Sequence, residues 1–159
     1  MTSTAKALLV YLSPGDPDYL ISDKLEYGMK RVQKLGFMYL TAVMERDGVE
    51  AVIRDQTLEV FSLDSLLSDI RNNAYLFIGF YSAAAMKQRV VDYIKAIRKS
   101  ALNAPILVGG PGFYSGKDYL EAGADIICNG EGERTIVEIL EHLKGKKPIR
   151  EVKGITYRV

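Results

Sequence analysis

The sequence predicts an α/β domain in which helices cover both faces of a parallel sheet. Five short runs rich in Val, Ile, Leu and aromatic residues recur along the chain, and helical patterns separate them. Each run is apolar at almost every position, which is typical of strands buried on both faces. Alternating strands and helices require right-handed crossovers, which give a three-layer sandwich. Because no internal repeat is present, we expect a flavodoxin-like (Rossmann-like) five-stranded parallel sheet with the order 2-1-3-4-5.

The expected strands take up the apolar runs. They cover residues 6–12, 49–54, 75–80, 105–108 and 125–128. Between them, apolar residues at spacings of three and four predict amphipathic helices. These helices are expected within residues 36–46, 63–70, 86–97 and 136–143. The first of them should end at Asp47-Gly48, since glycine commonly follows the last helical turn.

One connection is much longer than the two to six residues usual in this architecture. About 22 residues, 13–34, separate the first strand from its helix, and they include Pro14, Gly15 and Pro17. The loop leaves the sheet at the edge where ligands bind in such folds. Two interpretations stay open: a lid over that site, or a surface excursion with a short helix near residues 23–30.

Length and composition favour one soluble domain covering residues 1–159. Of these residues 48% are hydrophobic and 26% are charged, which suffices for one ordinary core. The formal charge of +1 provides no field that would attract nucleic acid or an anionic membrane. No apolar run approaches the roughly 20 residues of a membrane span, and residues 1–6 lack the pattern of an export signal. We therefore expect a cytoplasmic protein that binds neither nucleic acid nor membrane.

Two glycine-rich turns follow the last two expected strands. The first contains Gly109, Gly110 and Gly112, and the second, at residues 130–132, opens a helix. Glycine lets the backbone come close to a ligand, and the first turn of a helix offers free N–H groups to oxygen-rich groups. The carboxyl ends of parallel strands meet at one edge, so both turns should serve one binding site.

The residues at this edge argue against other ligands of the same fold. A phosphoacceptor receiver domain needs acidic residues after its first and third strands and a lysine after its fifth. Those places hold Leu12-Ser13, Phe80-Tyr81-Ser82 and Cys128-Asn129. Pro14 and Pro17 provide no N–H groups for an FMN phosphate. The turn at 130–135 lacks the third glycine of a dinucleotide-binding fingerprint.

Catalytic groups are also missing from the expected edge. The only histidine, His142, falls near the end of the last helix, so no Ser-His or Cys-His pair can form there. The only cysteine, Cys128, is expected to be a small buried hydrophobic residue. Glu131 or Glu133 is explained by capping at a helix N-terminus. We therefore predict a cofactor-binding module with no catalytic or metal-ligating residues of its own.

Read in order, these motifs resemble the N-terminal cobalamin-binding domain of the cobalamin-dependent radical SAM family, which includes methyltransferases and the anaerobic ring cyclase of chlorophyll synthesis. The resemblance covers nearly the whole chain. It rests on residues 35–48, 78–82, 105–112 and 125–135, and on the tail 152–158, which is similar to the strand that closes that domain.

The resemblance implies where cobalamin would lie. The corrin ring would cover the C-terminal edge of the sheet, and its nucleotide tail would pass between strands. Small residues at 82–83 and 109–110 would border the dimethylbenzimidazole, and the turn at 130–132 would border the ribose and phosphate. The aromatic residues there would either cover the macrocycle or pack under the loops. The expected cofactor-binding residues are Ser13, Tyr81, Ser82, Ala83, Gly109, Gly110, Gly112, Phe113, Gly130, Glu131 and Gly132. A bulky residue in place of Ser82 or Gly110 is expected to block the tail without unfolding the domain.

The resemblance also implies a cofactor state and a partner. The Asp-x-His-x-x-Gly signature of cobalamin mutases is absent, so we expect base-off cobalamin without a histidine ligand. A radical SAM barrel in the same longer chain would hold a [4Fe–4S] cluster and S-adenosylmethionine, because one cysteine cannot replace three. The isolated chain would then have no turnover. Two alternatives stay open: a cobalamin-free scaffold of the same family, and an FMN- or nucleotide-binding domain.

Overall fold

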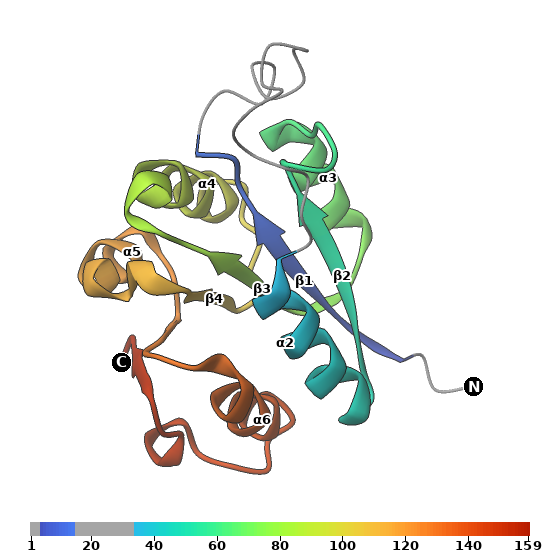
Figure 1. Ribbon diagram of the computed structural model, residues 1–159, viewed down its shortest axis with the longest axis vertical. Helices are drawn as coiled ribbons and strands as arrows, with labels where there is room; N and C mark the ends of the chain where they lie inside the picture. Colours follow the sequence, from blue (N-terminus) through green and yellow to red (C-terminus); the bar gives the residue numbers. More distant parts are fainter. Residues whose placement is uncertain (1–3, 15–33) are drawn as a thin grey trace.

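A six-stranded sheet runs through the part of the chain that the computed structural model describes, residues 4–14 and 34–159 (Figure 1). Its strands are β1 Ala5–Tyr11, β2 Val49–Asp55, β3 Tyr75–Tyr81, β4 Ile106–Gly109, β5 Ile126–Cys128 and β6 Ile155–Tyr157. Their order across the sheet is β2-β1-β3-β4-β5-β6. Most of the long loop, residues 15–33, lies outside the described residues, so its two interpretations stay open.

The predicted order 2-1-3-4-5 is confirmed for the five parallel strands, but the expectation of only five strands is wrong. The additional strand, β6, pairs with β5 in antiparallel register, with Ile126 opposite Tyr157 and Cys128 opposite Ile155. It lies in the tail that the resemblance assigned to a closing strand. Without it, β5 would present unpaired backbone groups at the sheet edge.

Helices separate the parallel strands as the apolar spacing predicts. They are α2 Leu35–Arg46, α3 Leu63–Asn72, α4 Lys87–Lys99, α5 Gly116–Ala122 and α6 Gly132–Leu143. Short 3-10 turns occupy Ala84–Met86, Pro111–Ser115 and Ile149–Glu151. The helix α5 has only seven residues, too few to show a clear apolar period, and it ends at Gly123 with a left-handed φ of 116°. This brevity explains why apolar spacing did not reveal it.

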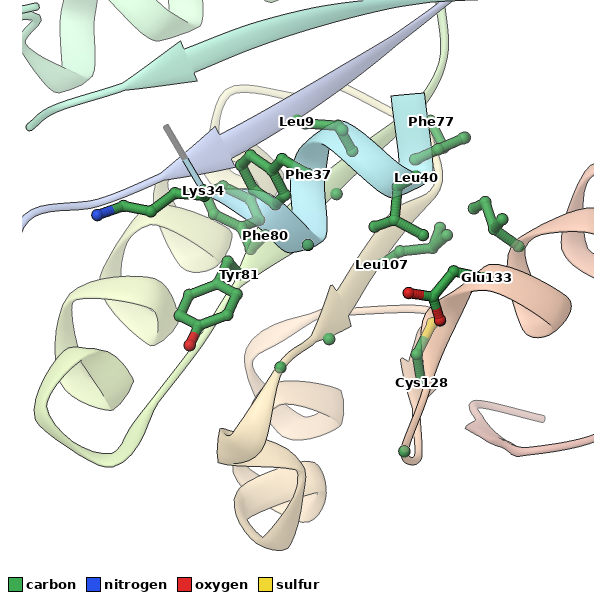
Figure 2. A pocket seen from close by; sticks show the side chains of 17 residues that line it. Leu9, Lys34, Phe37, Leu40, Phe77, Phe80, Tyr81, Leu107, Cys128 and Glu133 are labelled. Carbon is green, nitrogen blue, oxygen red and sulfur yellow. The ribbon is translucent and has the colours of Figure 1, made fainter. Parts of the chain in front are cut away.

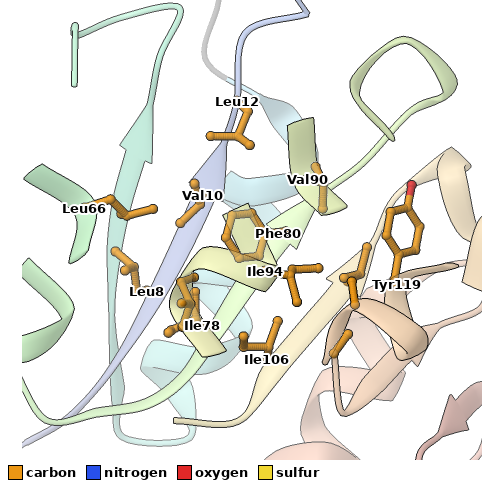
Figure 3. Close-up of a cluster of buried hydrophobic side chains, with 14 of the residues drawn as sticks. Leu8, Val10, Leu12, Leu66, Ile78, Phe80, Val90, Ile94, Ile106 and Tyr119 are labelled. Atoms are coloured by element: carbon orange, nitrogen blue, oxygen red, sulfur yellow. The ribbon is translucent and has the colours of Figure 1, made fainter. Parts of the chain in front are cut away.

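The helices α3, α4 and α5 cover one face of the sheet, and their apolar side chains fill it (Figure 3). Leu8, Val10, Ile78 and Ile106 point to this face from neighbouring strands, and all are 1% exposed or less. Leu66 from α3, Ile94 from α4 and Tyr119 from α5 complete the cluster. Because side chains alternate along a strand, the residues between these strand positions must face the other layer.

The helices α2 and α6 cover the opposite face and complete the three layers (Figure 1). This second cluster combines Leu9, Phe77 and Leu107 from the sheet with Phe37 and Met44 from α2. Ile136, Ile139 and Leu140 of α6 join it. The predicted three-layer sandwich is therefore confirmed, with three helices on one face and two on the other.

A polar network closes the N-terminal end of the sheet. Asp125 accepts hydrogen bonds from the backbone N–H of Ile106 (2.8 Å) and from the guanidinium groups of Arg98 and Arg158. Arg98 also donates to the carbonyl oxygens of Gly123, Leu102 and Ala104. This network links α4, β4, β5 and the chain segment after β6. The C-terminal end of the sheet, where the glycine-rich turns lie, is built differently.

Candidate ligand-binding site

A cavity of about 180 Å³ opens at the C-terminal edge of the sheet, between the strands and the helices α2 and α6 (Figure 2). Four strands and both helices of this layer contribute to it. Its lining residues are Leu9, Lys34, Gly36, Phe37, Leu40, Phe77, Gly79, Phe80, Tyr81, Leu107, Gly109, Gly110, Cys128, Gly130, Gly132, Glu133 and Ile136. The site is therefore a hollow within the α2/α6 layer.

Two strand glycines create the floor of this hollow. Gly79 of β3 stands between Leu9 of β1 and Leu107 of β4 in the register of the sheet. A Cβ atom at Gly79 would lie 3.1 Å from Cδ2 of Leu9 and 3.3 Å from Cε2 of Phe77, so a side chain at this position would crowd both neighbours. One row nearer the edge, Gly109 pairs with Tyr81, and a Cβ atom there would meet only Cβ of Cys128, at 3.6 Å. The two absent side chains leave a flat backbone surface.

The inner wall of the cavity is apolar. Leu9, Phe77, Leu107 and Ile136 line it and are at most 5% exposed. Their strands β1, β3 and β4 each have neighbours on both sides, so the ladder occupies their backbone N–H and C=O groups. The inner wall therefore offers a ligand van der Waals contact and very few hydrogen-bonding groups.

The open side of the cavity lies between two helix N-termini. The cap residues are Lys34 for α2 and Glu131 for α6, and neither side chain caps its helix with a hydrogen bond. By contrast, Ser62 caps α3 by accepting from the N–H of Ser65 at 3.1 Å. Gly36 and Gly132, in the first turns of α2 and α6, line the cavity. Two uncapped N-termini make this opening favourable for an anionic or oxygen-rich group.

Aromatic rings stand beside this opening. Tyr11 stacks on Tyr81 with ring centroids 5.1 Å apart, and the edge of Phe37 meets both rings at 6.5 and 6.3 Å. The ammonium nitrogen of Lys34 lies 4.2 Å from the centroid of the Tyr11 ring. Burial, followed by the nearby Tyr81 and Asp55, raises the pKa of Tyr11 above its usual value, so its hydroxyl stays neutral at physiological pH. The cluster provides a flat amphipathic border that carries one positive charge.

Among the described residues that line the cavity, Cys128 alone carries sulfur. Burial raises the pKa of its thiol to about 12, so the group is a neutral thiol at physiological pH. The expectation of a small hydrophobic residue is close to this, although Cys128 is half-buried and borders the cavity. The thiol therefore acts in the cavity as a small, weakly polar group.

Five of the residues expected to bind a cofactor line the cavity together: Tyr81, Gly109, Gly110, Gly130 and Gly132. Ser13, Ser82, Ala83, Gly112 and Glu131 do not line it. Ser82 is fully buried and its hydroxyl is 2.6 Å from the hydroxyl of Tyr119 on α5, so its side chain belongs to the opposite face. Ala83 packs against the same opposite cluster, and the N–H of Gly112 donates to the carbonyl of Ser82 at 2.8 Å.

The remaining expected residues lie around the edge. Ser13 is buried after β1, where its N–H donates to Oε1 of Gln56 at 3.0 Å. Glu131 is exposed at the start of α6. The backbone of Phe113 lies in the 3-10 turn after β4, and its side chain is outside what the structure describes.

The structure changes two expectations about the path of a ligand. The strands β3 and β4 pair continuously from Ile78 and Ile106 to Tyr81 and Gly109, so no ring can pass between them. The hollow lies over the sheet, on its α2/α6 face. Gly110 has a left-handed φ of 95°, and a Cβ atom there would lie 2.7 Å from the carbonyl oxygen of Ser82. A bulky residue at 110 would strain the fold itself, contrary to the expectation of an unperturbed domain.

Sequence reasoning missed several lining residues, notably Gly79, Phe37, Leu40 and Glu133. Gly79 carried a usable signal, because an isolated glycine inside an apolar strand often marks a close approach. Phe37 and Leu40 belong to the apolar stripe of α2 and look like ordinary core residues in the sequence. Only their position over the missing side chains of Gly79 and Gly109 makes them part of the site.

Metal ligands are not gathered in the described part of the chain. Within residues 4–14 and 34–159, no group of three or more His, Cys, Asp or Glu side chains could hold a metal ion. His142 lies near the end of α6, and its Nδ1 is 2.9 Å from the carbonyl oxygen of Lys147. No helix in the same ranges is long and apolar enough to cross a membrane.

Solved structures of two larger enzymes contain a region with the same fold. The chain superposes on OxsB, a cobalamin-dependent S-adenosylmethionine radical enzyme solved with aqua-cobalamin and S-adenosylmethionine bound, with a TM-score of 0.76 and 18% identity over 96% of this chain and 20% of that chain. It superposes on TsrM from Kitasatospora setae, a radical S-adenosylmethionine methyltransferase solved with cobalamin and a [4Fe-4S] cluster bound, with a TM-score of 0.70 and 19% identity over 99% of this chain and 29% of that one. The chain thus spans less than a third of either enzyme.

A receiver domain shares the architecture more distantly. The receiver domain of the Francisella response regulator 1452 gives a TM-score of 0.54 and 16% identity over 90% of this chain and 99% of that one. All three identities are low, so these superpositions establish the fold alone. No curated protein sequence matches the chain.

The sequence itself matches a family model. Residues 30–140 match the model of the B12 binding domain, which is more than two thirds of the chain. The matched range runs from the start of α2 through the glycines of β3 and β4 to most of α6, and so contains most of the cavity lining. The chain therefore belongs to the B12-binding domain family.

Proposed function

We propose that this chain binds cobalamin and holds its nucleotide tail in the cavity under α2 and α6. The observation that carries the proposal is the glycine-floored hollow at the C-terminal edge of the sheet, in a chain of the B12-binding domain family. The base of the tail is a flat aromatic group. A floor without Cβ atoms at Gly79 and Gly109, under a roof of apolar side chains, fits such a group.

Different parts of the site serve different parts of the cofactor in this proposal. The base lies against Gly79 and Gly109, the ribose and phosphate lie near the N-termini of α2 and α6, and the corrin ring covers the edge near Tyr81. Among the residues expected from the sequence, Tyr81, Gly109, Gly110, Gly130 and Gly132 contact the cofactor. Ser13, Ser82, Ala83, Gly112 and Glu131 instead shape the surrounding loops, and Phe113 belongs to the turn after β4. The buried bond between Ser82 and Tyr119 supports that division.

The proposal includes a base-off cofactor without histidine ligation. A base that lies in the cavity cannot also coordinate cobalt. His142 is ten residues beyond Gly132 on α6, about 15 Å along the helix axis, which supports the absence of a histidine ligand from this chain. Cobalamin, when bound, supplies cobalt chemistry such as methyl transfer. The residues of this chain bind it and set its orientation.

We further propose that the cofactor serves a radical SAM domain in the same longer protein. Structural similarity to OxsB and TsrM supports this, since the chain spans only 20% and 29% of those enzymes. The cluster and S-adenosylmethionine would belong to that other domain, because the single cysteine of this chain cannot hold a cluster. Methyl transfer or a related radical reaction is the activity expected of the whole protein.

The first test is a visible-absorbance titration of the purified chain with hydroxocobalamin, followed by desalting. Retention of the colour with the protein and a base-off spectrum are the expected results. A protein that retains no cobalamin would contradict the proposal and favour a scaffold. A protein that is yellow as purified and binds FMN would favour a flavin-binding domain.

A matched pair of variants ties binding to the cavity. Gly109→Ala and Gly116→Ala each add one methyl group. Its nearest neighbour would lie at the ordinary contact distance of 3.6 Å, in Cys128 for the first and in Ile127 for the second. Only Gly109 lines the cavity. We expect Gly109→Ala to weaken hydroxocobalamin binding by roughly three- to tenfold, in line with the cost of crowding a packed contact. The Gly116→Ala control should bind as the parent chain does; equal effects in both variants would place the cofactor elsewhere.

A further inference from the structure

The lining of the cavity bears on which lower base of a cobalamin-like cofactor fits it, and this inference rests on the proposed function. Such cofactors share the corrin ring and differ in the base that ends the nucleotide tail. A dimethylbenzimidazole has an apolar carbocyclic edge, whereas adenine carries an exocyclic amine and additional ring nitrogens. The two bases are similarly flat, so the chemistry of the cavity wall, more than its shape, must distinguish them.

Among the residues that the structure describes, the inner wall has no polar side chain for a purine. Leu9, Phe77, Leu107 and Ile136 are buried apolar side chains, and Figure 2 shows the first two at the closed end of the cavity, under α2. The backbone polar groups of the strands beneath them are occupied within the ladder, because β1, β3 and β4 are all interior strands. The amine and ring nitrogens of adenine would lose water there and gain no partner.

The polar side chains of the cavity gather at its open side. Lys34, Tyr81 and Glu133 are all half-buried, in contrast to the inner residues. Lys34 and Glu133 belong to the N-termini of α2 and α6, and Figure 2 shows the ammonium group of Lys34 directed away from Leu40 and Leu107. Groups in these positions can meet the sugar, the phosphate or solvent. A base lying over Gly79 lies one row deeper in the sheet than Gly109 and Tyr81, which pair with each other.

We propose that this chain selects cofactors with a benzimidazole-type lower base and discriminates against those with a purine base. Leu9, Phe77, Leu107 and Ile136 are the residues that determine this specificity. Leaving buried polar groups unpaired typically weakens binding by roughly 10- to 100-fold. We therefore expect the adenine-containing analogue to bind weaker than cobalamin by a factor in that range.

The test compares three ligands on the purified 159-residue chain by equilibrium titration: hydroxocobalamin, the analogue with adenine in place of dimethylbenzimidazole, and cobinamide, which lacks the nucleotide tail. The expected order of affinity is hydroxocobalamin first, with both other ligands at least about tenfold weaker. Equal or tighter binding of the adenine analogue, with hydroxocobalamin still bound, would overturn the specificity inference and leave the proposed function standing. Failure of hydroxocobalamin to bind at all would overturn the proposed function itself.

A substitution in the inner wall tests whether its apolar side chains cause the preference for the benzimidazole base. Leu107→Asn places an amide at the inner wall, where it can donate to a ring nitrogen or accept from the amine of adenine. We expect the ratio of the two affinities to fall at least threefold, mainly because the adenine analogue gains a partner. A folded variant, verified by circular dichroism, that keeps the parent ratio would contradict the assignment of specificity to this wall. If that variant does not fold, Ile136→Gln, which changes the α6 side of the same wall, is measured by the same criterion.

Discussion

The face of the sheet under α3, α4 and α5 is filled by side chains, whereas the face under α2 and α6 keeps a hollow of about 180 Å³. Both faces are lined by the same kinds of apolar residue. They differ at two strand positions, 79 and 109, where the α2/α6 face has glycine and a side chain would otherwise stand. The site therefore arises because two glycines lack side chains in a core layer, and no separate binding element is added to the fold.

Truncation of two neighbouring residues of β4 should show the largest effect of this difference between the faces. Ile106 points into the filled face and Leu107 into the hollow one, and both are at most 3% exposed. We expect Ile106→Ala to lower the free energy of unfolding by about 4 kcal/mol and Leu107→Ala by about 2.5 kcal/mol. Leu107 loses less because the cavity already deprives it of contacts on one side. Urea denaturation measures both values, and equal losses would show that the hollow is closed in solution.

Binding of the cofactor should remove part of this difference. Hydroxocobalamin at 100 times its Kd should raise the free energy of unfolding of the parent chain by about 2.7 kcal/mol, since it binds only the folded state. The Leu107→Ala variant should gain less, because it has lost a wall of the cavity, and Ile106→Ala should gain as much as the parent. Thermal unfolding with and without the cofactor checks this. A full gain in Leu107→Ala would place the ligand outside the hollow.

Ser82 sharpens the comparison, because it adjoins the site in sequence and yet serves the filled face. Its hydroxyl pairs with that of Tyr119 in a buried position. Ser82→Ala leaves the Tyr119 hydroxyl without its partner and should cost about 1–3 kcal/mol of stability. Cobalamin affinity should change by less than about twofold. Tyr119→Phe removes the same bond from the other side, and the two substitutions together should be clearly non-additive; a large loss of affinity in Ser82→Ala alone would return Ser82 to the binding surface.

Alkylation of the Cys128 thiol tests the comparison without any expected change in stability. Burial raises its pKa to about 12, well above the usual value of a thiol, so the reactive thiolate is scarce at physiological pH. At pH 8 its alkylation by iodoacetamide should be at least about 100-fold slower than that of an exposed thiol, because reactivity follows the thiolate fraction. The rate should rise as pH increases toward 12, and bound cobalamin should slow it further. Mass spectrometry measures the rate of alkylation. If bound cobalamin does not slow it, the ligand lies away from Cys128.

The sequence predicted the residues at the open edge of the site better than those at its inner wall. The turns at 109–112 and 130–132 were recognisable because glycine followed by a helix start has a local meaning. Gly79 and Leu40 were not, because their role depends on which strands are neighbours and which helix lies above them. Successive side chains point to opposite faces of a sheet, so Tyr81 borders the cavity and Ser82, the next residue, does not. Adjacency along the chain suggested a shared role for these two residues, and alternation across the sheet assigns them to opposite layers.

By itself the sequence determined the alternation of strands and helices, the parallel order of the first five strands and the end of the sheet at which the glycine-rich turns gather. These properties follow from local apolar patterns and from the handedness of crossovers. Only the tertiary structure decided that β6 joins the sheet, that the hollow lies under α2 and α6, and that Gly79 and Gly109 form its floor. Those features depend on register and on packing between segments far apart in sequence, which no local pattern contains.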